Sequence, residues 1–308
     1  MNQLLQYLDI SDDVLEAIDK DIPVIGLETA ILSNGLSYPD NYHMAMEVVR
    51  IIQEAGCVPA TLAVLNGRIK VGLSEDQIKF MCQSSGIIQM TRKDLPFVVA
   101  KQIHGSTTVA TSIIISRMVG IKLLVTAGIG GVHRGGQDTF DVSRDLQELA
   151  NNDIALVCSG PKSILDVGLT LEYLETFGVP VLGYQTDRMP AFGQRDSGFY
   201  LDYRIDEAKE IGKVVKTKWD IGLEGGVLIC NPIGPHLELD TESLEQALQE
   251  TIEESKRKHL EIKQATPLLL DRVLELTEGK SLLTIIEMLK SNARLGAQIA
   301  KELYRIDY

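Results

Sequence analysis

The most constraining feature of this 308-residue sequence is the alternation of short apolar runs with longer amphipathic stretches. Seven runs are typical of buried strands: PVIGLETAI (23–31), PATLAVLNGRI (59–69), PFVVAKQI (96–103), KLLVTAGIGG (122–131), DIALVCSG (153–160), PVLGYQT (180–186) and GGVLICNPI (225–233). Helical periodicity is found at 42–55, 107–118, 143–151, 163–177, 205–219, 242–259 and 281–304. This alternation predicts an α/β fold with helices over a largely parallel sheet. Because no linker or repeat interrupts it, we expect residues 1–308 to form a single domain.

Composition and charge exclude several classes of protein. Hydrophobic residues make up 44% of the chain, and 43 acidic against 30 basic residues give a net charge of −13. A nucleic-acid partner is not expected, because such a surface requires a basic patch. No signal peptide or membrane-spanning run is apparent, so no membrane partner is expected. The four cysteines are far apart, which favours free thiols and a cytoplasmic location.

Two strand-end segments carry candidate site residues, because ligands of α/β sheets bind where strands end and loops begin. Glu28 follows an apolar run and has hydroxyl and amide neighbours, an environment in which a carboxyl can act as a general acid or base. A structural carboxylate that caps a helix is the alternative interpretation. The segment GSTTVATS (105–112) opens a predicted helix, where backbone N–H groups and hydroxyls favour an anion. Ordinary helix capping by Ser or Thr explains the same pattern.

The glycine-rich stretch TAGIGGVHRGGQDTFDVSRDLQE (126–148) is the most unusual part of the sequence. Glycines let a backbone approach a ligand closely, and Arg134, beside His133, suits an oxyanion. Asp141 can hold a hard divalent cation whose shell is completed by water, although it also lies where a helix cap is expected. The glycine spacing does not match the dinucleotide-binding motif, so a nicotinamide cofactor is not expected.

In ALVCSGPKSILD (155–166), Lys162 is the only charged residue of the turn that connects a predicted strand with a predicted helix. We expect that helix to begin at Ser163. A cation at a helix N-terminus opposes the helix dipole, so a lysine held there has a lowered pKa and can act as an amine nucleophile. The alternative is a side chain that simply reaches solvent.

These segments together resemble the pseudouridine-5′-phosphate glycosidase family, which includes the indigoidine synthase A proteins. The resemblance runs from Pro23 onward through ETAILSNGLSYPDN, NGRIKVGLS, DLPFVVAKQIHGSTTVATS, TAGIGGVHRGGQDTFDVSRDLQELA, VCSGPKSILDVGLTLEYLETFGVPVLGYQT, PAFG and GGVLICNPI. It implies the reversible cleavage of the C–C glycosidic bond of pseudouridine 5′-phosphate, which gives uracil and ribose 5-phosphate through a lysine imine. It also implies α/β/α layers and a homotrimer.

The resemblance assigns roles to individual positions of this sequence. The nucleophile corresponds to Lys162, the proton donor to Glu28, and the ligand of Mn²⁺, with Mg²⁺ as an alternative, to Asp141. Substrate contacts correspond to Gln89, Val109, Ser143, Arg144 and Asp145. His133 and Arg134 lie in the same stretch without an assigned role.

Two positions depart from the family pattern. Gln89 stands where a substrate-contacting lysine is usual, with Arg92 or Lys93 as the nearest substitutes, and Ile285 stands where an asparagine is expected to contact uracil. Because the sugar-side residues are retained, we expect the reaction type to be kept, and we hypothesise an aglycone other than uracil. A family branch that binds uracil with other residues is one alternative. A non-catalytic sugar-phosphate-binding protein is another.

Overall fold

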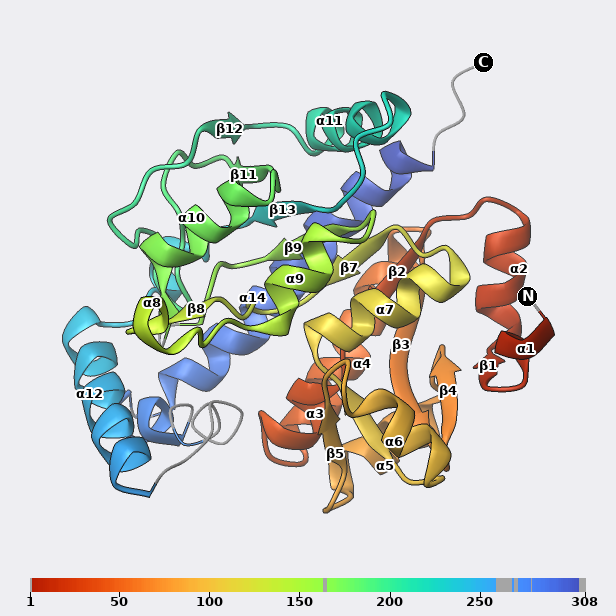
Figure 1. The fold of residues 1–308 in the computed structure, drawn as a ribbon, viewed down its shortest axis with the longest axis horizontal. Coiled ribbons are helices and arrows are strands. Elements are labelled where there is room, and N and C mark those ends of the chain that lie inside the picture. The colour runs from red at the N-terminus through yellow and green to blue at the C-terminus, as the bar shows by residue number, and fades with distance from the viewer. Residues whose placement is uncertain (1, 163–164, 259–267, 269–270, 278, 305–308) are drawn as a thin grey trace.

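A mixed eleven-stranded sheet forms the centre of the computed structural model, which describes residues 2–162, 165–258, 268, 271–277 and 279–304 (Figure 1). The strands follow the order β1-β4-β3-β2-β7-β9-β13-β11-β12, and β5 and β6 extend it beside β3. Their bounds are β1 Leu8–Ile10, β2 Val24–Leu27, β3 Val58–Leu65, β4 Arg68–Val71, β5 Ile88–Met90, β6 Gly105–Thr107, β7 Leu123–Val125, β9 Ala155–Cys158, β11 Val181–Tyr184, β12 Tyr203–Ile205 and β13 Val227–Cys230. From β3 to β12 every neighbouring pair is parallel, which confirms the predicted sheet.

Helices cover both faces of this sheet, so the expected α/β/α layering is confirmed. Figure 1 shows α7, α9 and α10 in front of the sheet and α14 behind it. The helices are α1 Asn2–Leu5, α2 Asp12–Asp19, α3 Ala30–Asn34, α4 Asp40–Glu54, α5 Glu75–Gln83, α6 Leu95–Ala100, α7 Val109–Val119, α8 Gly136–Thr139, α9 Arg144–Ala150, α10 Val167–Thr176, α11 Ala208–Asp220, α12 Thr241–Lys258 and α14 Lys280–Leu303, with a 3₁₀ turn at Pro235–Leu237. That residues 1–308 form a single domain stays a prediction.

Alternation along the buried strands divides the core into two apolar clusters, one on each face. In β9, Ala155 and Val157 pack with α4, α11 and α14, whereas Leu156 and Cys158 pack with α7 and α9 on the other face. Gly296 lets α14 lie close to the sheet, because a Cβ at this position would be 2.6 Å from Cγ2 of Val125. The close fit places the polar residues of α14 against the ends of β7 and β9.

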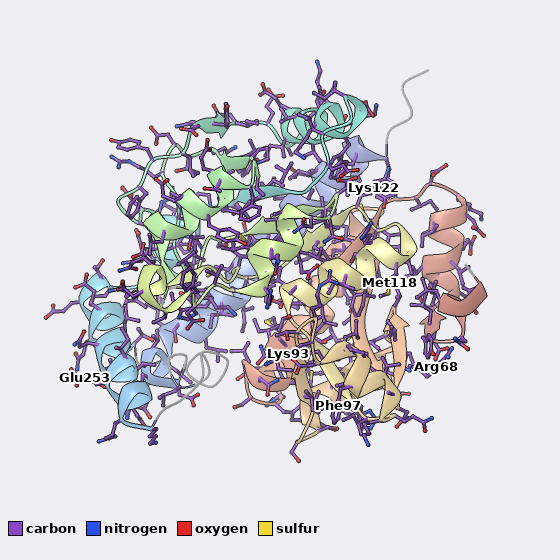
Figure 2. All side chains as sticks on the ribbon, in the orientation of Figure 1. Arg68, Lys93, Phe97, Met118, Lys122 and Glu253 are labelled. Carbon is purple, nitrogen blue, oxygen red and sulfur yellow. The ribbon has the colours of Figure 1, made fainter. Side chains whose placement is uncertain are left out.

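Several predicted elements need correction. The run 96–103 is mostly helix α6, not a strand: Pro96 occupies the first turn, Leu95 and Val98 are buried at helical spacing, and Phe97 is 54% exposed (Figure 2). The helix predicted at 107–118 begins at Val109, because 105–107 pair as β6.

Other boundaries shift by a few residues. The predicted helix 205–219 begins at Ala208, after β12. The predicted end of the helix 242–259 and the expected helix start at Ser163 lie outside the described residues. No helix in the described ranges is long and apolar enough to cross a membrane.

Candidate functional site

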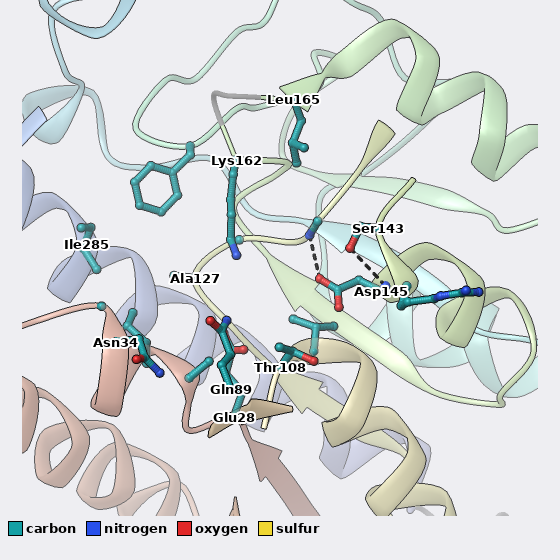
Figure 3. Close-up of a pocket in the computed structure, with 18 of the residues that line it drawn as sticks. Glu28, Asn34, Gln89, Thr108, Ala127, Ser143, Asp145, Lys162, Leu165 and Ile285 are labelled. Carbon is teal, nitrogen blue, oxygen red and sulfur yellow. Dashed lines mark hydrogen bonds between the residues drawn. The ribbon is translucent and has the colours of Figure 1, made fainter. Parts of the chain in front are cut away.

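The carboxyl ends of the parallel strands meet at one edge of the sheet, and a cavity opens there (Figure 3). Glu28 directly follows β2, the glycine-rich loop follows β7, and Lys162 lies four residues beyond β9. Seven of the eight site residues predicted from the sequence line this cavity: Glu28, Gln89, Val109, Ser143, Arg144, Asp145 and Lys162. Asp141, the eighth, does not line it. Their individual roles stay predictions.

Glu28 places a half-buried carboxyl group at the cavity wall, where the Thr126 hydroxyl is its hydrogen-bond partner. The Thr126 hydroxyl donates a hydrogen bond to Oε1 of Glu28. Burial raises the pKa of Glu28 to about 7, and the charge of Asp145 adds to this effect, while Lys162 and the Thr126 hydrogen bond oppose it. A carboxyl with this pKa is partly protonated and partly ionised near neutral pH, so it can donate or accept a proton.

The turn before Lys162 requires glycine and holds the lysine against the glycine-rich loop. Gly160 has a φ of +95°, and a Cβ there would be 2.0 Å from the carbonyl oxygen of Pro190. The Lys162 N–H donates to the carbonyl of Ile129 at 3.2 Å. In Figure 3 the Lys162 amine points into the cavity, towards Gln89 and Glu28.

The expected position of Lys162 at a helix N-terminus is wrong. Leu165 and Asp166 form a short strand, β10 (Leu165–Asp166), which pairs with β8 (Val132–His133). Asp166 then caps α10 by accepting a hydrogen bond from the Leu169 N–H at 2.9 Å. Lys162 therefore precedes the first residue of α10, Val167, by five positions and does not belong to its first turn.

Asp145 joins three segments of the cavity wall. Its Oδ1 accepts a hydrogen bond from the Ala110 N–H, at the start of α7, and its Oδ2 accepts one from the Gly130 N–H, each at 2.9 Å. Ser143 caps α9 by accepting a hydrogen bond from the Asp145 N–H at 3.2 Å. Both carboxylate oxygens thus orient backbone, and the N-termini of α7 and α9 are held at the same side of the cavity.

A buried amide network supports Thr126 from behind, and no local pattern in the sequence indicates these contacts. Asn292 of α14 is fully buried and donates hydrogen bonds to the Thr126 carbonyl at 2.8 Å and to Ser159 Oγ at 3.1 Å. Its own side-chain oxygen accepts from Asn231 at 2.9 Å. The network therefore connects α14 and the ends of β7, β9 and β13 with the residue that holds Glu28.

Asn292→Ala is expected to lower the free energy of unfolding by about 2–4 kcal/mol, because it leaves the Thr126 carbonyl and the Asn231 amide buried without this partner. Urea denaturation followed by circular dichroism measures the change. Asn151→Ala is the matched control, since Asn151 is exposed and its side chain bonds only the nearby Gln147 carbonyl. Equal losses for the two variants would contradict a structural role for the network.

His133 and Asp141 lie next to the polar side of the cavity. His133 lines it, is 9% exposed, and its Nε2 is buried without a hydrogen-bond partner. Burial lowers the pKa of His133, the charge of Lys162 lowers it further, and that of Asp141 opposes both effects, so the three side chains are close enough to interact. Arg134 is exposed and does not line the cavity. Across the described residues, no group of three or more His, Cys, Asp or Glu forms a preorganised metal site.

Polar and apolar side chains both line the cavity. The polar half contains Thr108, Val109, Ser143, Arg144, Asp145 and His133. Seven larger apolar side chains also line the cavity: Ile31, Leu36, Leu165, Phe192, Leu244, Val273 and Ile285. Figure 3 shows Ser143 and Asp145 on one side of Lys162 and Ile285 on the other. Of these residues only Ile285 was singled out from the sequence; Phe192, Leu244 and Val273 lie in distant parts of the chain and were not predicted.

Arg92 and Lys93, which could have supplied the positive charge that Gln89 lacks, do not line the cavity. Arg92 forms an ion pair with Glu148, with Nη2 and Oε2 2.7 Å apart. Lys93 is exposed (Figure 2). Gln89 itself lines the cavity as an uncharged amide.

Comparison with known proteins agrees with this arrangement. A sequence profile described as indigoidine synthase A like protein matches residues 13–302. A protein of Petrotoga mobilis named pseudouridine-5′-phosphate glycosidase is 49% identical over 296 residues, which are 96% of this chain and 97% of the relative. One of the same name from Caldanaerobacter subterraneus is 48% identical and is matched over 98% of both chains.

Two solved structures share the fold over nearly their whole length. The prealnumycin C-glycosynthase AlnA, in complex with ribulose 5-phosphate, has a TM-score of 0.88 at 32% identity, and 97% of each chain is covered. An indigoidine synthase A-like protein from Thermotoga maritima has a TM-score of 0.87 at 33% identity, with the same coverage. Sequence and structure together show that the chain belongs to the indigoidine synthase A-like family, whose relatives are named pseudouridine-5′-phosphate glycosidases.

Proposed function

We propose that this chain is an enzyme that reversibly cleaves the C–C glycosidic bond of pseudouridine 5′-phosphate, which gives uracil and ribose 5-phosphate. The observation that carries the proposal is the presence of the Glu28 carboxyl and the Lys162 amine in one cavity, whose wall combines polar and apolar side chains. The names of relatives matched over nearly their full length support it. AlnA, with its bound sugar phosphate, supports a sugar phosphate as the ligand.

The polar half of the cavity suits the sugar phosphate. Backbone N–H groups at the start of α7, the Thr108 and Ser143 hydroxyls and the Arg144 guanidinium offer donors to a phosphate. With the phosphate there, the anomeric carbon lies near Lys162, and the aglycone extends towards the apolar side chains of the wall.

Glu28 and Lys162 divide the chemistry between proton transfer and covalent attack. Protonated Glu28 gives its proton to the ribose ring oxygen as the bond from this oxygen to C1 breaks, and the neutral Lys162 amine forms a bond to C1. The Glu28 carboxylate takes the proton that the attached lysine nitrogen loses and passes it to the ring carbon of uracil. The C–C bond breaks towards that carbon, while the nitrogen lone pair becomes the C=N bond of an imine. Water adds to the imine and releases ribose 5-phosphate and the free amine.

We further propose that Asp141 binds Mn²⁺, with Mg²⁺ as the alternative. One carboxylate with His133 beside it is not a preorganised cage, but hard divalent cations are commonly held by one or two carboxylates, water and a substrate phosphate. When bound, such an ion supplies positive charge that orients the phosphate. We also propose a homotrimer in the cytoplasm, as the family resemblance implies, and light scattering tests the oligomeric state.

The proposal predicts a covalent adduct between Lys162 and the sugar. The protein is incubated with ribose 5-phosphate and Mn²⁺, reduced with borohydride, digested and examined by mass spectrometry. We expect a pentose-phosphate adduct on the peptide that contains Lys162, because borohydride reduces an imine to a stable amine. The absence of an adduct anywhere on the chain would favour a non-catalytic sugar-phosphate-binding protein.

A further inference from the structure

Two buried threonines form a reciprocal set of hydrogen bonds beside the cavity. Thr29 and Thr107 are fully buried, and their hydroxyl oxygens are 3.3 Å apart. Both hydroxyls donate to one acceptor, the carbonyl of Leu62 in β3, at 2.7 and 2.9 Å. Each hydroxyl oxygen also accepts the backbone N–H of the other threonine, at 3.1 and 3.0 Å. We refer to the two threonines and the Leu62 carbonyl as the threonine clamp.

The threonine clamp fills a gap in the hydrogen bonding along one edge of β3. β2 pairs with the first half of β3, where Leu27 lies opposite Thr61, and β6 pairs with the second half, where Ser106 lies opposite Ala63. Because β4 occupies the other edge, β2 and β6 lie end to end on the same edge of β3. The Leu62 carbonyl is at their junction, and the two hydroxyls take the place of a strand N–H there.

Each threonine directly adjoins a part of the candidate site. Thr29 follows Glu28, and Thr107 precedes Thr108, the residue that caps α7. Thr29 also stands at the cap position of α3, but its hydroxyl makes no capping hydrogen bond there and bonds Leu62 instead. Glu28 and Thr108 line the cavity, whereas neither threonine of the clamp does (Figure 3). The clamp therefore fixes the backbone beside the proton donor relative to the backbone at the start of α7.

The spacing between these two parts matters for proton transfer. A general acid must lie within hydrogen-bond reach of the atom that it protonates. In the proposed reaction that atom is the ribose ring oxygen, whose place is set by the phosphate at the start of α7. A misplacement of about 1 Å can lower the rate on the order of a hundredfold. A fixed spacing between Glu28 and α7 thus brings the ring oxygen of the bound sugar within reach of the carboxyl.

We propose that Thr29 and Thr107 are positioning residues, which hold the Glu28 carboxyl at the correct distance from a phosphate bound at the start of α7. The inference rests on the proposed function for the identity of the substrate. Loss of the clamp is expected to slow the reaction of bound substrate more than it weakens binding. The reason is that Asp145 holds the start of α7 independently, through the Ala110 N–H at 2.9 Å.

Thr107→Val removes one hydroxyl and keeps a side chain of similar shape, whereas Thr107→Ser keeps the hydroxyl. In the full-length protein we expect Thr107→Val to lower kcat for pseudouridine 5′-phosphate cleavage by about 10- to 100-fold, with KM within about threefold of wild type. Thr107→Ser should keep kcat within about threefold of wild type. An unchanged kcat in folded Thr107→Val, or an effect on KM alone, overturns the inference.

The matched control is Thr251→Val. Thr251 is a fully buried threonine of α12 that donates to the Ala247 carbonyl of its own helix at 2.7 Å and does not line the cavity. Its replacement should leave kcat within about twofold of wild type. An equal loss of kcat in Thr251→Val would mean that removal of any buried hydroxyl impairs turnover, and it would overturn the special role of the clamp.

A double variant tests whether the two threonines act as one unit. If they do, Thr29→Val combined with Thr107→Val should lower kcat by no more than about threefold beyond either single variant. Losses that multiply would show separate roles and overturn the clamp. Because the loss of buried hydrogen bonds can impair folding, circular dichroism checks each variant, and Thr107→Ala replaces a valine variant that does not fold.

A second readout does not depend on the reaction. Burial raises the pKa of Glu28 to about 7, with Lys162 and Asp145 as the charged groups that act on it. If the clamp holds this carboxyl in place, Thr107→Val lets water reach it, and its pKa falls by about one unit or more. Urea denaturation between pH 5 and 8 measures this pKa, with Thr107→Val combined with Glu28→Gln as the reference.

The two readouts separate the inference from the proposed function. A Glu28 pKa in Thr107→Val that equals that of wild type overturns the inference, whether or not the wild-type protein is active. The absence of both turnover and the Lys162 adduct in wild type overturns the proposed function, while a lowered Glu28 pKa in Thr107→Val still supports the positioning of this carboxyl by the clamp.

Discussion

Lys162→Ala is expected to lower kcat/KM for pseudouridine 5′-phosphate cleavage by about a thousandfold or more. The reason is that the covalent route requires an amine, and among the described residues that line the cavity Lys162 is the only one that carries a primary amine. The guanidinium of Arg144 cannot substitute for it, because it stays protonated in proteins. Release of uracil in a steady-state assay measures the loss, and the borohydride adduct should disappear with it.

The matched control for this prediction is Lys213→Ala. Lys213 is an exposed lysine on α11 that does not line the cavity, so its removal should leave turnover within about twofold of wild type. Lys162→Ala should still bind ribose 5-phosphate, since the donors of the polar half are unchanged. Turnover by Lys162→Ala at more than a tenth of the wild-type rate would rule out the lysine-imine mechanism.

Glu28→Gln is expected to lower turnover by about 10²–10⁴-fold and, at the same time, to stabilise the protein at alkaline pH. Burial raises the pKa of Glu28 from 4.5 to about 7. Between these values the folded protein holds the proton more tightly than the unfolded chain does, so stability falls as the pH rises from about 4.5 to about 7. Above pH 7 the ionised carboxylate destabilises the fold by roughly 3 kcal/mol, and glutamine removes that cost.

Urea denaturation of Glu28→Gln and wild type at two pH values checks the stability part. The expected gain in unfolding free energy is about 3 kcal/mol at pH 8 and about 1 kcal/mol at pH 5.5. Glu175→Gln, on the exposed face of α10, is the control and should change stability by less than about 0.5 kcal/mol at either pH. Equal stability of Glu28→Gln and wild type at pH 8 would show that the carboxylate is not desolvated.

The sequence predicted those parts of the fold and of the site that depend on local order along the chain. Glu28 and Lys162 follow apolar runs, and parallel strands bring the residues that follow them to one edge. The run at 96–103 was misread because a short apolar stretch is compatible with a strand or a helix, and Pro96 at the first turn favoured the helix. The position of Lys162 depended on pairing of 165–166 with the glycine-rich loop, which no local pattern indicates.

The parts of the site that could not be predicted depend on contacts between distant segments. Asn292 bonds Thr126 across 166 positions of sequence. Leu244 and Val273 line the same cavity as Ile285 only because the chain returns to the cavity after the sheet is complete. No local periodicity or motif indicates such contacts, because neither partner differs in kind from the residues next to it in the sequence.

The place of α14 in the fold has a consequence for biosynthesis. This helix covers β2, β7 and β9 and supplies Asn292, yet it is made after every strand of the sheet. During translation the chain therefore carries Glu28 and Lys162 for a long interval while the sheet face between them is bare and the Thr126 carbonyl lacks its amide partner. Contacts of such long sequence separation form slowly, and uncovered apolar strands aggregate. We therefore expect the site to be completed only after α14 has been synthesised and has packed on the sheet.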